Sequence, residues 1–526
     1  MIARLKYPKI QGTSKMWRIA NVLIGSILLL ALLVILLGRS TDPVRQSGDL
    51  QSDQLAAAES PLMIFCAASN RAVMEKVISD YAAEYGRQVD VQYGPSQTLL
   101  SQMELSDVGD LYLPADDSFL LMAREKELVA EILPIAKMQG VIAVKKGNPK
   151  AILDFEDLLR DEIRLVQADP DAAAIGKVVR KVLQQSGTWE SLKSATTVFR
   201  TTVNEAANDV VVGGADAAIV YDAVLHTYPD LEFVEIDELI PTLSQISVGV
   251  IRSTKQPADA LHFARFLSAA DRGLKRYAEY GFRVAGGDQW SDVPQLRLFA
   301  GSMLRPAIED TIAAFEKREG VVIDTVYNGC GILVAQMKSG QVPDAYFACD
   351  KEFMEQVPEL FPTPIDVSQN ELVIAVQKGN PHQIATLSDL TKKGLRVGVG
   401  HEKQCAMGWL TQNTFREGGI QQEVMENVTV QSPTGDMLVN QMRSGALDAA
   451  VVYLSNTAGS GDVLDAVRIQ GLECSIAVQP YAVSPHSENG QTASRLFEQI
   501  CKAESKEAFT AEGFGWVQVT DTEKND

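Results

Sequence analysis

Two stretches of the sequence, Lys146-Gly147-Asn148-Pro149 and Lys378-Gly379-Asn380-Pro381, are identical and lie 232 residues apart. Further along the chain, Ile219-Val220-Tyr221 returns as Val451-Val452-Tyr453 at the same spacing. Chance similarity does not keep register over two hundred residues, and an internal repeat has to be recognised before any local pattern is interpreted. The sequence therefore predicts one domain that is present twice in tandem.

The repeated unit has an α/β pattern. Within each copy, short apolar runs alternate with segments of helical periodicity, which predicts α/β architecture with largely parallel strands. Buried strands are predicted at Leu62–Phe65, Val141–Val144, Ala217–Val220, Leu296–Phe299, Leu372–Val376 and Ala449–Val452. The predicted domains cover residues 61–285 and 294–517, with a short polar linker at 286–293 and a polar tail at 518–526. Each copy is long enough to form two α/β lobes.

A membrane anchor is predicted near the N-terminus. The run from Ile19 to Leu37 contains no charged residue and nearly spans a bilayer core at helical rise. Only basic charges precede it, so residues 1–18 are expected to stay in the cytoplasm, with the bulk of the chain periplasmic or otherwise extracytoplasmic. Residues 19–38 are therefore predicted to form a single transmembrane helix, and residues 39–60 an exposed linker. A cleaved signal peptide is the alternative, but the exit at Gly38–Pro43 offers no small-x-small cleavage site.

Charge and cysteine content exclude other classes of protein. The formal net charge of −20 argues against nucleic acid as a partner, because phosphate backbones are bound through positively charged surfaces. The six cysteines are sparse, and none of them forms a CxxC pair. They therefore match neither a disulfide framework nor a zinc-finger pattern.

Four predicted helix starts in the first copy could face an anion. They are Ser69, Ser96 after a Gly-Pro turn, the segment Asp169–Gly176, and Thr201-Thr202-Val203. The unpaired N–H groups and the dipole at a helix N-terminus concentrate partial positive charge, which suits an anion. A single such serine is more commonly an ordinary N-cap. It is the combination of four helix starts with Tyr221 at a strand end that indicates a site.

This combination resembles the molybdate-binding protein of ABC importers. The motifs that carry the resemblance are Phe65-Cys66-Ala67-Ala68-Ser69, Gly109–Asp116, Lys146–Pro149, Ala168-Asp169-Pro170, Ala218–Tyr221 and Tyr280-Gly281-Phe282. The resemblance covers nearly the whole of each copy. It implies two periplasmic-binding-protein-like (type II) domains, each of which closes two lobes around a ligand by hinge motion. It also implies an ABC permease and its ATPase as partners, with neither enzymatic activity nor a cofactor.

The resemblance further implies a ligand set for the first copy. In that family, two serine hydroxyls, backbone amides and a tyrosine hydroxyl hold the tetrahedral dianion. By position these donors are the hydroxyls of Ser69, Ser96 and Tyr221 and the backbone N–H groups of Ile175 and Val203. Neutral donors of this kind fit an acidic chain, and a shell without acceptors disfavours protonated phosphate. The expected ligand is molybdate or tungstate.

Two carboxylates in the same copy, Asp110 and Asp116, suggest a paired-carboxylate site at first sight. The family pattern instead indicates that they are local turn and capping groups.

The second copy departs from this ligand set. Ser302 and Tyr453 match, and Met407 and Gly435 fall at the two backbone-donor positions, but Cys330 stands opposite the second serine. A thiol donates a hydrogen bond more weakly than a hydroxyl, and a thiolate would repel a dianion. We therefore expect weaker oxyanion binding here, or a different ligand.

The residues Cys330, Cys349, His401 and Cys405 of the second copy allow three interpretations. The cysteines could be small buried hydrophobic residues, or Cys330 and Cys405 could form a disulfide across the closed cleft. In the third interpretation, the thiol and imidazole groups are ligands for a soft metal ion or for an oxyanion of softer chemistry. A nucleophile and base are disfavoured, because no acid/base framework accompanies them.

The predicted function is extracytoplasmic binding of an oxyanion for ABC-type import, from the cell membrane to which the chain is anchored. The membrane tether is a departure from the family pattern, since such receptors are usually free or lipid-anchored. The alternative is a membrane-tethered module that senses an oxyanion or redox state, or acts as a scaffold, without transport. In that case domain 2 would bind a different ligand through its cysteines.

Overall fold

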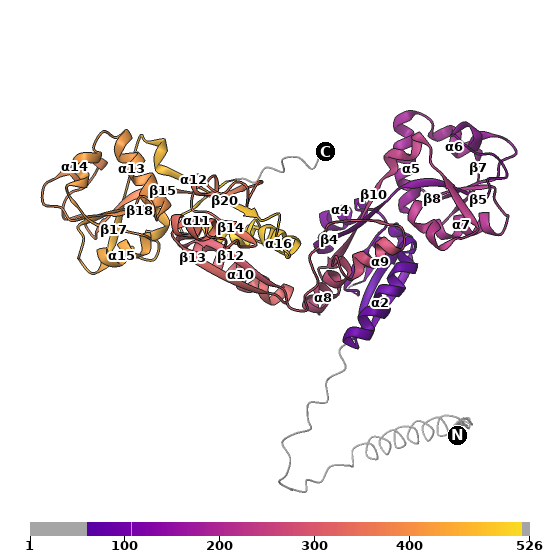
Figure 1. Cartoon of the computed structure of the whole chain (residues 1–526), viewed down its shortest axis with the longest axis horizontal. Coiled ribbons are helices and arrows are strands. Elements are labelled where there is room, and N and C mark those ends of the chain that lie inside the picture. Colours follow the sequence, from indigo (N-terminus) through magenta and orange to yellow (C-terminus); the bar gives the residue numbers. More distant parts are fainter. Residues whose placement is uncertain (1–59, 107, 518–526) are drawn as a thin grey trace, which may run out of the picture. The chain divides into compact units, whose positions relative to one another are not determined.

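The computed structural model describes residues 60–106 and 108–517. They form two α/β domains, the first built from strands β1 to β11 and the second from β12 to β21 (Figure 1). The predicted anchor at residues 19–38 lies outside the described residues. Within the described part of the chain, no helix is both long and apolar enough to cross a membrane.

Domain 1 contains two sheets, one in each lobe. The first has the order β11-β4-β10-β3-β1-β2 and the second the order β7-β6-β8-β5-β9. The strands of the first are β1 (Leu62–Ala67), β2 (Val89–Gly94), β3 (Leu111–Leu113), β4 (Val129–Met138), β10 (Ser244–Ile251) and β11 (Arg283–Val284). Those of the second are β5 (Gly140–Lys145), β6 (Leu165–Ala168), β7 (Thr196–Arg200), β8 (Ala217–Tyr221) and β9 (Leu231–Val234). The chain enters the second lobe between β4 and β5 and returns at β10. Each lobe therefore contains one sheet, but the first lobe is built from two separate stretches of the chain.

The prediction of largely parallel strands is wrong. β1 is parallel to β2 and β3, and β6 is parallel to β7 and β8. However, β10 is antiparallel to β3 and β4, and β5 is antiparallel to β8 and β9. Parallel neighbours need a crossover connection within one sheet. The strands that carry the chain between the lobes have no such crossover, and they are therefore antiparallel to their neighbours.

Helices cover both sheets of domain 1. They are α2 (Arg71–Tyr85), α3 (Ser96–Leu105), α4 (Ser118–Glu125), α5 (Ala174–Ser186), α6 (Trp189–Ala195), α7 (Val203–Val211), α8 (Pro257–Ser268) and α9 (Gly273–Glu279). In α2, Val73, Val77 and Tyr81 lie at helical spacing, and all three are buried against the sheet. The helix ends at Gly86, whose left-handed backbone (φ 66°) a residue with a side chain adopts only at a cost.

Domain 2 repeats this topology, which confirms the predicted duplication. Its strands are β12 (Gln295–Gly301), β13 (Val322–Asn328), β14 (Ala345–Phe347), β15 (Ile365–Gln377), β16 (Val397–Gly400), β17 (Val428–Ser432), β18 (Ala449–Tyr453), β19 (Leu464–Arg468), β20 (Ile476–Val483) and β21 (Gly515–Trp516). Its helices are α10 (Arg305–Glu319), α11 (Cys330–Lys338), α12 (Lys351–Met354), α13 (Ala406–Glu417), α14 (Gln421–Met425), α15 (Gly435–Arg443), α16 (Gly490–Ile500) and α17 (Ala503–Ala511). Each of the six predicted buried strands lies inside an observed strand of its domain.

One strand of domain 2 differs in how it connects the lobes. β15 has 13 residues and pairs with β20 along its first half and with β18 and β19 along its second. It therefore runs from one lobe into the other without interruption, where domain 1 uses β4 and β5. The two sheets of domain 2 are joined through this strand into one ten-stranded sheet.

A glycine in the first turn of α5 in domain 1, and of the equivalent helix α13 in domain 2, lets the helix pack closely against the end of a strand. A Cβ atom on Gly176 would lie 2.4 Å from the carbonyl oxygen of Ala168, and one on Gly408 would lie 2.5 Å from the carbonyl carbon of Gly400. We expect Gly176→Ala to lower the free energy of unfolding by about 1–3 kcal/mol, because the backbone must move to admit the methyl group. Thermal unfolding followed by calorimetry measures this.

The control for this substitution is Gly490→Ala, where a Cβ meets no atom within 4 Å. Equal melting temperatures for the two variants would contradict the packing argument.

Candidate functional site

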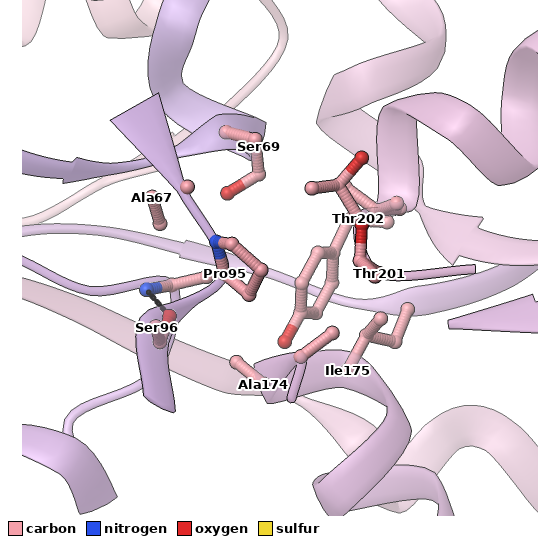
Figure 2. Close-up of a pocket in the computed structure, with 14 residues that line it drawn as sticks. Ala67, Ser69, Pro95, Ser96, Ala174, Ile175, Thr201 and Thr202 are labelled. Carbon is pink, nitrogen blue, oxygen red and sulfur yellow. Dashed lines mark hydrogen bonds between the residues drawn. The ribbon is translucent and has the colours of Figure 1, made fainter. Parts of the chain in front are cut away.

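A cavity lies between the two lobes of domain 1 (Figure 2). The first lobe contributes Ala67, Ala68, Ser69, Gly94, Pro95, Ser96 and Ala115, and the second contributes Ala173, Ala174, Ile175, Thr201, Thr202, Val203 and Tyr221. None of these 14 described residues has a charged side chain. The space open to the centre of a water-sized molecule is ≈ 20 Å³, which suits a small ion rather than a sugar or a peptide.

Ser69 supplies a buried hydroxyl that is available to a ligand. It lies in the short 3₁₀ helix η1 (Ala68–Asn70), between the end of β1 and the start of α2. Its Oγ is buried and has no hydrogen-bond partner among the described residues. In Figure 2 this hydroxyl points toward the space between the two lobes. A buried hydroxyl without a partner is costly, so a ligand atom that accepts its hydrogen bond would stabilise the site.

The Ser96 hydroxyl is held in a fixed orientation. Ser96 is the first residue of α3, after the extended Pro95. Its Oγ accepts a hydrogen bond of 3.1 Å from the backbone N–H of Ala115, drawn dashed in Figure 2. Because this bond uses a lone pair of the oxygen, the single hydroxyl hydrogen remains available as a donor.

Two helices of the second lobe begin at the cavity. Ile175 is the second residue of α5, and Val203 is the first residue of α7. The first four N–H groups of a helix have no acceptor within it. At α7, Thr202 and Glu205 form a capping box. The Thr202 Oγ1 accepts a hydrogen bond of 3.2 Å from the N–H of Glu205, and the Glu205 carboxylate accepts hydrogen bonds from the N–H groups of Thr201 and Thr202. Both helix starts therefore present partial positive charge to the cavity.

Tyr221 ends β8 and is buried at the base of the site. Its hydroxyl shares a hydrogen bond of 3.1 Å with Ser244 Oγ. Burial raises the pKa of Tyr221 well above its usual range, and the nearby charge of Asp116 adds to this shift. The hydroxyl therefore stays protonated and can act as a donor.

The structure brings together all five residues predicted from the resemblance. Thr201 and Thr202, which the sequence predicts to begin a helix, line the cavity themselves. The structure adds one residue that the sequence did not single out: Ser244, the first residue of the returning strand β10, bonds to Tyr221. No local pattern marks Ser244, because its role depends on a contact with another strand.

The lobes of domain 1 touch beside the cavity. The N–H of Gln97, in the first turn of α3, donates a hydrogen bond of 3.2 Å to the carbonyl of Ala172, in the loop before α5. The helix starts of the two lobes are therefore held against each other.

The two carboxylates interpreted as turn groups have different roles. Asp116 accepts a hydrogen bond of 3.0 Å from the N–H of Ser118, as expected for a turn group. Asp110 instead accepts from the N–H of Met63 at 2.8 Å and from Thr254 Oγ1. It connects β1 to the segment after β10, so its interpretation as a purely local group is wrong.

Domain 2 places its candidate residues at the matching ends of elements. Ser302 begins the 3₁₀ helix η5 (Ser302–Leu304) after β12, and Met407 and Gly435 lie in the first turns of α13 and α15. Tyr453 ends β18, and its buried hydroxyl has no hydrogen-bond partner among residues 60–106 and 108–517.

A disulfide joins Cys330 to Cys349, with their Cα atoms 6.2 Å apart. Of the three interpretations of these residues, the one that pairs Cys330 with Cys405 is therefore wrong. Cys349 lies in the same lobe as Cys330, two residues after the end of β14. Ala115, which contacts Ser96, lies two residues after the end of the matching strand β3 in domain 1. Cys405 is a free, buried thiol at the N-cap of α13 in the other lobe. Burial raises the pKa of this thiol to about 11.

The soft-metal interpretation of the four residues is not supported. Two of the three sulfurs are joined to each other, and the His401 Nδ1 accepts a hydrogen bond of 3.2 Å from the N–H of Lys403. Within the part of the chain that the structure describes, no three or more His, Cys, Asp or Glu side chains form a group that could hold a metal ion.

Comparison with known proteins identifies the family. The model for the bacterial extracellular solute-binding protein family matches residues 62–283 and again residues 296–515. The chain therefore belongs to this family of binding proteins and contains its domain twice.

Two relatives and one solved structure are similar to about two fifths of this chain each. A Haemophilus influenzae protein named only as a binding protein is 27% identical over 229 residues, which cover 43% of this chain and 91% of the relative. The molybdate-binding protein ModA of Mycobacterium tuberculosis is 26% identical over 212 residues, covering 40% of this chain and 79% of the relative. A solved periplasmic molybdate-binding protein of Azotobacter vinelandii is 16% identical, with a TM-score of 0.38, and covers 43% of this chain and 100% of that one. The predicted tandem relationship to molybdate-binding proteins is confirmed.

The cysteine pairing can be tested directly. Peptide mapping without reduction is expected to recover one linked pair, Cys330 with Cys349, and the denatured, unreduced chain to titrate as four thiols. Digestion after alkylation of the free thiols, followed by mass spectrometry, measures both. A peptide that links Cys330 to Cys405 would contradict the structure.

Proposed function

We propose that domain 1 binds a tetrahedral oxyanion, molybdate or tungstate, outside the cytoplasm and delivers it to an ABC permease and its ATPase. The observation that carries the proposal is the composition of the cavity. Its polar groups are hydroxyls and helix-start N–H groups, and the buried Ser69 hydroxyl has no protein partner among the described residues.

The chemistry of these groups favours a fully ionised anion. Each of Ser69, Ser96 and Tyr221 can donate one hydrogen, and the N–H groups of Ile175 and Val203 donate along helix dipoles. A protonated anion would need an acceptor in the shell. Discrimination between molybdate and the smaller sulfate would then depend on the size of the cavity. The names of the molybdate-binding relatives support the same ligand class.

The placement of the chain is part of the proposal. Residues 19–38 would anchor it in the cell membrane, and residues 61–285 and 294–517 would act outside the cytoplasm as two binding domains. The family description as extracellular supports this side of the membrane.

A second candidate function is sensing without transport. The observation in its favour is the Cys330–Cys349 disulfide, which lies in domain 2 at the position of the Ser96 contact in domain 1. A disulfide that changed its redox state would give domain 2 a response that oxyanion import alone does not need.

The ligand set of domain 1 is tested by removing its hydroxyls. Ser69→Ala, Ser96→Ala and Tyr221→Phe each remove one hydrogen bond to a charged ligand, which is worth about 1.5–3 kcal/mol. Each variant should therefore weaken molybdate binding by about tenfold or more. Isothermal titration calorimetry on the purified chain measures the affinity.

The control is Ser106→Ala, at the far end of α3, where the hydroxyl bonds to the carbonyl of Gln102. The affinity of this control variant for molybdate should match that of the parent protein. If a chain with all three cavity substitutions bound molybdate as tightly as the parent, this site would be ruled out.

Binding should also be insensitive to alkaline pH. An ordinary tyrosine, with a pKa of about 10, would be partly ionised at pH 9.5 and would repel a dianion. Because burial raises the pKa of Tyr221, its hydroxyl keeps its hydrogen there. The affinity for molybdate at pH 9.5 should then lie within about twofold of that at pH 7.5. A loss that occurs in the parent but is absent in Tyr221→Phe would show that Tyr221 ionises.

A further inference from the structure

The disulfide of domain 2 takes the place of a specific contact in domain 1. Ser96 and Cys330 are each the first residue of the matching helix, α3 and α11. The Ser96 Oγ accepts the N–H of Ala115 at 3.1 Å, and the Cys330 Sγ accepts the N–H of Cys349 at 3.0 Å. The backbone at this corner is therefore organised in the same way in both domains.

The two corners differ in what remains available to a ligand. In Ser96, the second bond of the oxygen carries a hydrogen that can be donated to an anion. In Cys330, the sulfur is bonded to the sulfur of Cys349 instead of to a hydrogen. The oxidised corner of domain 2 therefore has no side-chain hydrogen to donate, and it presents sulfur lone pairs instead.

The surrounding chain makes room for the sulfur atoms. Domain 1 has Ala68 in the cavity wall where domain 2 has Gly301. A Cβ on Gly301 would lie 2.4 Å from the Cys349 Sγ and 3.3 Å from the Cys330 Sγ. The disulfide therefore depends on the absence of a side chain at residue 301, and it projects toward the space that is the cavity in domain 1.

The same corner touches the opposite lobe. Gly329 and Gly331 flank Cys330, where domain 1 has Pro95 and Gln97. A Cβ on Gly329 would lie 2.4 Å from the carbonyl oxygen of Gln404, and one on Gly331 would lie 2.1 Å from that of Lys403. These carbonyls belong to the loop before α13 in the second lobe.

This contact links the disulfide to the closure of the cleft. Cys330 and Cys349 are 0% and 5% exposed, so a reductant reaches them only when the lobes open. Reduction breaks the S–S bond, so the two sulfurs can no longer lie within bonding distance at a corner that is packed against the second lobe.

We propose that Cys330–Cys349 is a reversible redox site that controls oxyanion binding by domain 2, an inference that rests on the proposed function of domain 1. A dithiol reductant transfers two electrons and two protons to the disulfide and becomes a disulfide itself. The S–S bond breaks and each cysteine gains a hydrogen. Cys330 then has an S–H donor at the position of the Ser96 hydroxyl, which joins Ser302, Tyr453 and the helix starts at Met407 and Gly435.

The stoichiometry of tungstate binding by the full chain tests this proposal. The oxidised protein should bind about one tungstate per chain, in domain 1. After reduction with a phosphine and removal of the reductant under argon, it should bind two, the second at least about tenfold more weakly because a thiol is a poor donor. The measurement is calorimetry at pH 6, where thiols are protonated and Asp350, whose pKa burial raises to about 7, is largely neutral.

Two variants test the same point without reductant. Cys349→Ala leaves Cys330 as a permanent thiol, and Cys330→Ser combined with Cys349→Ala reproduces the Ser96 and Ala115 pair of domain 1. Both should bind two tungstates when oxidised, the second more tightly in the double variant. The control, Cys501→Ala, removes a thiol outside the cleft and should behave like the parent.

The outcomes separate the two proposals. A single site in the reduced parent and in both cysteine variants would overturn the redox site while leaving the function of domain 1 intact. Two equal sites in the oxidised parent would also overturn it. The absence of any site in every form would instead count against the proposed function.

Discussion

The first-turn N–H groups of α3, α5 and α7 have no acceptors inside their own helices, and the site of domain 1 depends on where those helices begin. The strands that pass between the lobes, β4, β5 and β10, place the first turn of α3 opposite the starts of the other two helices. Donors from separate lobes can then converge on one small cavity. Among the residues that the structure describes, no charged side chain lines it, so the partial charges of the backbone and the hydroxyl dipoles provide its electrostatic potential.

Fixed hydroxyls complete this arrangement. Ser96 is oriented by the N–H of Ala115, and Tyr221 is oriented by Ser244 and kept neutral by burial. Groups that are oriented before the ligand arrives lose little conformational entropy on binding, which favours both affinity and selectivity. Gly176 contributes to this order, because only a residue without a side chain lets α5 approach the end of β6 so closely.

Domain 2 keeps the framework and changes the chemistry at one corner. The backbone contact made by Ser96 is retained by Cys330, but the hydrogen is replaced by a covalent bond to sulfur. The glycines at 301, 329 and 331 accompany this change, since each lies where a Cβ would collide with a sulfur or with a carbonyl of the other lobe. The two copies therefore share a framework and differ in chemistry at this corner.

The repeat, the buried strands and the types of donor at the helix starts could be predicted from the sequence, because each leaves a local or periodic pattern in the chain. The directions of the crossing strands, the partner of Tyr221, the long-range bonds of Asp110 and the pairing of Cys330 with Cys349 could not. Each of these depends on the distance in space between separate elements of the chain, such as the start of α11 and the end of β14. Only the packing of the sheets determines that distance, and no residue pattern within a single segment contains it.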